Sequence, residues 1–169
     1  MRLKENIKDI YKTLLNDEHL LRLLHYKANH LDDDVLQITE ERPALLSLPL
    51  DKLWEIRDKH IVPAAISTNL DKQEICRLLL YPGSRRGTRN HYTARQDVAI
   101  EVITHVTFSN DLRQEAICDR LADLLFDNRI TGLGKVDSVA GDRINPNGLP
   151  TNFTGYRLIF SFGSSKGGS

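Results

Sequence analysis

The sequence has little cysteine, no excess of either charge and no long apolar run. Its two cysteines, Cys76 and Cys118, cannot build a disulfide scaffold, and each stands inside a stretch of regular pattern. We therefore expect buried, reduced thiols and no redox chemistry. Basic and acidic residues both number 23, which argues against binding nucleic acid or anionic membrane through the whole surface. No run approaches the roughly 20 apolar residues of a spanning helix, so we expect no membrane partner.

What the chain does contain is typical of one globular unit. Its 169 residues are 40% hydrophobic and 27% charged, and this length suffices for one core but not for two ordinary domains. We predict a single α+β domain over residues 1–163 and a flexible glycine- and serine-rich tail over 164–169. The first ten residues have polar breaks where a signal peptide would be apolar, which indicates a cytoplasmic origin.

The first half of the chain indicates mainly helices. Residues 3–14 and 18–28 carry apolar side chains at helical spacing, with Asp17 as the N-cap of the second helix. Residues 31–50 contain acidic runs and two prolines, so we expect irregular structure there. A short helix over 50–60 would present Leu50, Leu53 and Trp54, and 60–67 has the pattern of a strand weakened by Pro63.

The second half predicts four strands and one long helix. Strands are expected over 73–81, 95–108, 132–144 and 156–162. The second of these has one apolar face: Val98, Ile100, Val102, Thr104, Val106 and Phe108. Residues 109–128 form a helix, capped by Asn110 or Asp111, whose inner stripe is Leu112, Ala116, Ile117, Leu121, Leu124 and Leu125. The fold class is therefore α+β, with a mainly antiparallel sheet packed against one long helix and additional N-terminal helices. Unpaired sheet edges make an oligomer worth considering.

Charge is concentrated in the stretch YPGSRRGTRNHYTARQ, residues 81–96, which contains four arginines and no acid. Pro82 ends the preceding pattern and two glycines add freedom, so we predict a long, mobile β-hairpin loop. Its arginines could contact acidic protein surfaces or, as bidentate donors, the phosphates of DNA. The candidate interface or channel residues are Arg85, Arg86, Arg89, His91, Tyr92 and Arg95.

A search for catalytic, cofactor and metal sites finds no convincing pattern. His19, His25 and His30 lie near three consecutive aspartates, 32–34, but their spacing does not place them on one helix face. No serine lies in a nucleophile elbow, and His105 has the position of a surface or interface residue. The GLG of residues 132–134 follows a helix, whereas a phosphate cradle precedes one. We predict no catalytic residue, cofactor or metal.

The order of elements resembles a phage protein family. IYKTLLNDEHLLRLL, the long-looped strand pair over 73–108, the helix NDLRQEAICDRLADLLF and the late GYRLIFSF are similar to the tail terminator, or tail completion, proteins of long-tailed bacteriophages. The likeness covers about residues 1–28 and 60–163, and segment 31–60 departs from it.

This resemblance implies a virion protein without catalysis, assembled in the bacterial host cytoplasm. It implies a ring, usually a hexamer, that caps the tail tube and docks the tail onto the head connector. The implied partners are other copies of the chain, the tail tube protein and a connector or stopper protein, with DNA contact in the channel as a further option. Alternatives are a head-completion or stopper protein of the same neck, a small nucleic-acid-binding module that uses the arginine loop, and an enzyme assembled from distant residues.

Overall fold

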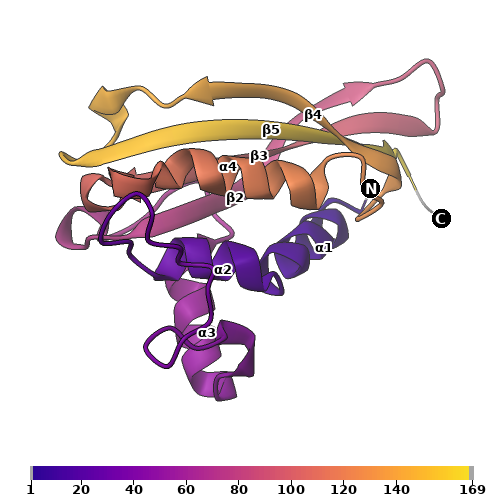
Figure 1. Ribbon diagram of the computed structural model, residues 1–169. Coiled ribbons are helices and arrows are strands. Elements are labelled where there is room, and N and C mark those ends of the chain that lie inside the picture. Colours follow the sequence, from indigo (N-terminus) through magenta and orange to yellow (C-terminus); the bar gives the residue numbers. More distant parts are fainter. Residues whose placement is uncertain (1, 168–169) are drawn as a thin grey trace.

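Five strands form one sheet, and helices cover one of its faces (Figure 1). The computed structural model describes residues 2–167. The strand order is β1-β2-β3-β5-β4; β1 pairs with β2 in parallel, and the other neighbours are antiparallel. This confirms the α+β class with a mainly antiparallel sheet. The strands are β1 (Ile61–Val62), β2 (Cys76–Gly87), β3 (Thr93–His105), β4 (Leu133–Arg143) and β5 (Phe153–Ser165).

The helices begin and end near the positions that the sequence predicts. Asp17 caps α2 as expected, because its carboxylate accepts a hydrogen bond from the backbone N–H of Leu20 at 2.7 Å. α2 ends at His25, three residues earlier than predicted. The helices are α1 (Leu3–Leu15), α2 (Glu18–His25), α3 (Leu50–His60) and α4 (Arg113–Leu125); short 3₁₀ turns are η1 (Leu45–Ser47), η2 (Leu70–Lys72), η3 (Val106–Asp111) and η4 (Pro146–Gly148).

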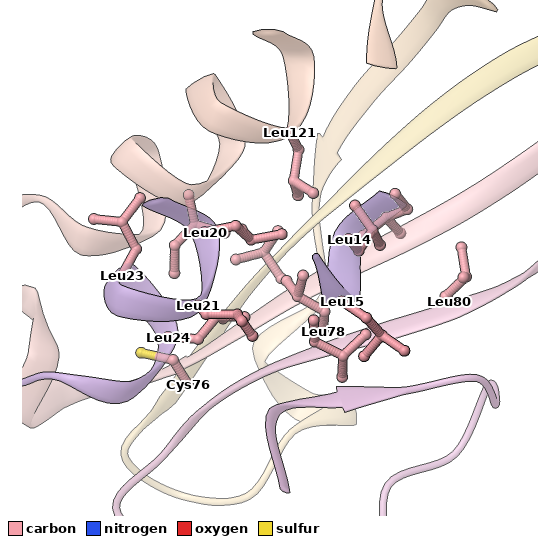
Figure 2. Packing of buried hydrophobic residues seen from close by; sticks show 14 of the residues in the cluster. Leu14, Leu15, Leu20, Leu21, Leu23, Leu24, Cys76, Leu78, Leu80 and Leu121 are labelled. Carbon is pink, nitrogen blue, oxygen red and sulfur yellow. The ribbon is translucent and has the colours of Figure 1, made fainter. Parts of the chain in front are cut away.

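The main core lies between the helices and the sheet. α4 contributes Ile117, Leu121 and Leu125, all fully buried, and the facing positions of β3 are Val98, Ile100 and Val102. Figure 2 shows Leu121 in the same cluster as leucines of α1, α2 and β2. The predicted contact between the α4 stripe and this strand face is therefore confirmed for these residues.

The end of β3 and the start of α4 differ from the prediction. β3 ends at His105, and the 3₁₀ turn η3 then reverses the chain. Val106 is consequently half exposed instead of continuing the strand face. Leu112 precedes α4 in the left-handed region (φ 54°) and is 61% exposed. The buried residue at the start of α4 is Arg113 instead of Leu112. Its guanidinium donates hydrogen bonds to the carbonyl of Leu23 at 2.6 Å and to the carboxylate of Asp111.

β3 is buried on both faces because it is a central strand. On the face away from the helices, Leu79 and Ile103 join Leu70, Ile75 and Phe153 in a second, smaller apolar cluster. A polar group follows along the same face: the Glu101 carboxylate accepts hydrogen bonds from Tyr81 at 2.5 Å and from Arg157 at 2.6 Å. The single apolar face expected for this strand is thus only part of its buried surface.

The C-terminal strand runs past the predicted domain boundary. β5 continues to Ser165, and Ser164 is buried and accepts a hydrogen bond from Arg85 at 3.2 Å. These two serines belong to the sheet because β3 offers Ala94 and Thr93 as register partners. Residues 168–169 of the expected tail lie outside the described residues. Within 2–167, none of the helices has the length and apolarity that crossing a bilayer demands.

Candidate interaction surface at the arginine hairpin

The predicted long arginine loop is a regular hairpin with a short turn. β2 continues to Gly87 and β3 begins at Thr93, so only residues 88–92 connect them. Arg85 pairs with Gln96 and Arg86 with Arg95 in the antiparallel register. The register shifts between Pro82 and Arg85, and a bulge tolerates a proline. The predicted length of the loop is therefore wrong, because the strand passes Pro82 instead of ending there; the predicted mobility stays a prediction for the five-residue turn.

Two of the arginines are held by aspartates that lie outside the stretch read from the sequence. Arg86 forms a two-pronged ion pair with Asp97 at 2.8 and 2.9 Å, and the Asp97 side chain is only 9% exposed. Arg95 forms an ion pair with Asp137 on β4. Asp97 comes directly after residue 96, so its proximity could have been noticed; Asp137 comes from a strand that only the sheet brings near.

Arg85 is also hydrogen-bonded within the domain. Its guanidinium donates to the carbonyl oxygen of Ser165 at 2.8 Å, to the hydroxyl of Ser164 and to the side-chain oxygen of Gln96. These bonds fix the hairpin against the end of β5. Arg85 therefore acts as a structural link, and its donors are used within the domain.

The turn itself is the part of the hairpin that is free for contacts. Arg89 and His91 are exposed, and Tyr92 is 80% exposed. Within residues 2–167, Arg89 takes part in no ion pair. The turn is ordered by a hydrogen bond from the Tyr92 amide to Asn90 Oδ1 at 2.9 Å and one from the Lys166 amide to the Tyr92 carbonyl at 2.8 Å. The structure thus separates the six candidate residues into three exposed turn residues and three arginines bound within the sheet.

Two of the residues weighed as metal ligands, Asp33 and His25, are bonded to other groups of the domain. Asp33 is held by Arg42 through two short contacts of 2.7 and 2.8 Å, and these hydrogen bonds lower the pKa of its carboxyl. His25 lies against His60 of α3, with 3.2 Å between Nδ1 and Nε2. In the part of the chain that the structure describes, no three His, Cys, Asp or Glu side chains gather as a metal site would require.

The two cysteines, His105 and Gly132 contribute to packing and hydrogen bonding within the domain. Burial raises the pKa of Cys76 and of Cys118 to about 12, so neither is a ready thiolate. His105 Nδ1 lies 2.9 Å from the Thr107 hydroxyl, and its ring meets Phe153 edge-on. Gly132 is needed for packing: its φ is +66°, and a Cβ there would lie 2.1 Å from the carbonyl oxygen of Gly163. This explains the GLG segment without a phosphate.

Comparisons with known proteins give a relative and a solved structure that each match nearly the whole chain. The SPbeta prophage-derived uncharacterized protein YomW of Bacillus subtilis (strain 168) is 26% identical over 176 residues, covering 96% of this chain and 97% of that protein. A chain from the virion of a native gene transfer agent particle superposes with a TM-score of 0.53 and 11% identity, covering 97% of this chain and 98% of the other, and so has the same fold. The YomW family model matches residues 17–162, which is most of the domain. The chain belongs to the YomW family.

Proposed function

We propose that this protein is a structural component of a phage virion, and that it forms a ring in the neck that ends the tail tube and joins the tail to the head. The observation that carries the proposal is the likeness, over almost the full length of both chains, to a chain of a gene transfer agent virion. The prophage origin of the YomW relative supports the same class. The neck position itself comes from the resemblance to tail terminator proteins.

The proposed activity is mechanical and requires no reacting site. The chain would act through interfaces with other copies, with the tail tube and with the head connector or stopper. The hairpin turn offers one such contact, because Tyr92 and Arg89 are exposed at its end. Aromatic and arginine side chains are the residue types that most often anchor protein interfaces.

Contact with DNA through this hairpin is the weaker alternative. Non-specific affinity for DNA depends on the number of phosphates that free cations neutralise. Arg85, Arg86 and Arg95 already bind groups of the domain. The charge that remains at the turn is small, which favours a protein partner.

Deletion of the gene from a phage that carries it tests the proposed function. We expect tails of uncontrolled length, or heads and tails that remain unjoined, in electron micrographs of the lysate. A stopper in the same neck would instead give tails of normal length together with heads that lose their DNA. Normal tails attached to filled heads would contradict both positions.

A further inference from the structure

A groove lies between α4 and the last two strands, at the end of the sheet away from the hairpin turn. Its volume is about 750 Å³, which is within the range of protein pockets that accept large side chains or ligands. Its apolar lining comes from both walls: Leu112, Cys118 and Ala122 on the helix side, and Tyr156 and Leu158 on β5.

The helix side of the groove carries unused acidic and polar groups. Glu115 and Asp119 line it, and neither takes part in an ion pair among the described residues. The side-chain nitrogen of Gln114 is buried there with no hydrogen-bond partner in residues 2–167, which is costly unless a partner arrives. Arg143 stands on the β4 side, while the other lining cation, Arg113, is neutralised by Asp111.

Leu112, which lines the groove, is unfavourable in two respects: its side chain and its backbone. Its side chain is 61% exposed, and its backbone has φ 54°, a conformation that is costly for a leucine. Glycine or asparagine would fit this backbone better. An exposed leucine at a strained position favours a role in contact with another molecule.

The groove and the hairpin turn lie at opposite ends of the central strand pair. Thr93 pairs with Ser165 beside the turn, and Thr104 pairs with Thr154 beside the groove. Thr104 follows Thr93 by eleven residues along β3, which is roughly 36 Å of extended strand. Figure 1 shows the β2–β3 turn on one side of the molecule and the start of α4 on the other.

We infer that the turn of one copy, Arg89 to Tyr92, docks in the α4 groove of the next copy. The Tyr92 ring would occupy the apolar lining, and Arg89 would pair with Glu115 or Asp119, whose charge it complements. The inference rests on the proposed ring. Because each copy presents the turn at one end and the groove at the other, copies can join head-to-tail, and such contacts close into a ring where the rotation between neighbouring copies closes. A two-fold dimer could also place each turn in the groove of the other copy, but it would end at two copies, whereas a ring repeats the contact from copy to copy.

Engineered cysteines test the contact between a turn and a groove. In a Cys118→Ala background, one protein carries His91→Cys, which keeps the Tyr92 ring, and the other carries Leu112→Cys. Mixed at high protein concentration under mild oxidation, they should form a disulfide-linked dimer, and the double variant should form a ladder of larger species on non-reducing gels. The control replaces Leu112→Cys with Ile66→Cys, which is 77% exposed and does not line the groove. Equal cross-linking in the Leu112 and Ile66 mixtures would overturn the inference.

Charge exchange, read out through the same cross-link, tests which charged groups meet in the contact. With the cysteines in place, Glu115→Arg with Asp119→Arg should lower the cross-linking rate at least tenfold, and adding Arg89→Glu to the turn partner should restore most of it. No restoration would mean that Arg89 does not face these acids. If deletion of the gene disrupts tails but the cross-link is absent, only this inference fails. A cross-link together with normal tails after deletion would instead reject the proposed function.

Discussion

The guanidinium of Arg22 on α2 donates a hydrogen bond from Nε to the backbone carbonyl of Val35 at 3.0 Å. Its other nitrogens donate to the carbonyls of Gln37 at 2.6 Å, Pro43 at 2.8 Å and Arg42 at 3.1 Å. The side chain is almost fully buried. One arginine therefore satisfies four backbone acceptors of the segment between α2 and α3, which has no sheet or long helix of its own to satisfy them.

Replacing Arg22 should unfold that segment locally and weaken the whole domain. Arg22→Met retains the length of the side chain but removes every donor; each buried carbonyl left without a partner costs about 1 to 3 kcal/mol, so we expect a total loss of about 3 kcal/mol or more. Urea unfolding measures the global change, and amide hydrogen exchange should show faster exchange over residues 34–48. Arg129→Met is the matched control, because Arg129 is exposed; an equal effect in both variants would contradict the assignment.

Leu121 is expected to be one of the most sensitive apolar positions. Leu121→Ala leaves a cavity in the main core and should lower the free energy of unfolding by about 2 to 5 kcal/mol. Leu50→Ala at the start of α3 removes the same atoms from a side chain that is 68% exposed and should change it by less than about 0.5 kcal/mol. Denaturant melts that give similar losses for both would show that the core is placed incorrectly.

The hairpin arginines should differ from one another in their effect on stability. From the sequence alone, replacing Arg85, Arg86 and Arg89 with serine is expected to leave the melting temperature nearly unchanged. The structure changes this expectation for Arg86, since Arg86→Ser leaves the buried Asp97 carboxylate without its ion-pair partner; we expect a loss of about 1 to 3 kcal/mol.

Arg89→Ser is the internal control for that experiment, because Arg89 is exposed at the turn and should contribute nothing measurable to folding. Thermal melts of Arg86→Ser and Arg89→Ser measure the difference in melting temperature. Equal melting temperatures would mean that the Arg86 ion pair does not stabilise the domain.

The His25–His60 pair should make stability depend on pH. His60 Nδ1 donates to the Cys76 carbonyl at 2.7 Å, so the neutral ring accepts at Nε2 from His25. Burial, together with the nearby His25, Lys59 and Arg77, lowers the pKa of His60 to about 3 although the hydrogen bond to Cys76 opposes this shift, and burial also lowers the pKa of His25. In the unfolded chain histidine titrates near about 6.5, so below that pH the unfolded state binds more protons than the folded state.

Stability is therefore fully present above about pH 6.5 and falls as the pH drops toward about 3; His60 alone accounts for a loss of about 1 kcal/mol between pH 7 and 5.5, and His25 adds to it in the same direction. Urea unfolding at these two pH values measures the loss. His60→Gln should lose less stability than the parent protein over this interval, whereas His91→Gln in the exposed turn should behave like the parent. An unchanged pH dependence in His60→Gln would exclude His60 as a source of the effect.

The sequence alone determined the elements whose pattern is local. Apolar side chains at helical spacing placed α1, α3 and α4, Asp17 marked the start of α2, and alternation indicated β3 and β5. These signals are readable because each depends on residues within one or two turns, or within one strand. The α+β class followed from their order.

Only the tertiary structure decided which polar groups are used inside the domain and which remain free. Arg22, Arg85, Arg86 and Arg113 look alike in the sequence as surface cations, yet each finds acceptors brought close by folding. The same is true of the groove beside α4, whose walls come from segments about 40 residues apart. A charged side chain is buried or exposed according to the partners that the folded chain places within hydrogen-bond distance, and those partners lie far away along the sequence.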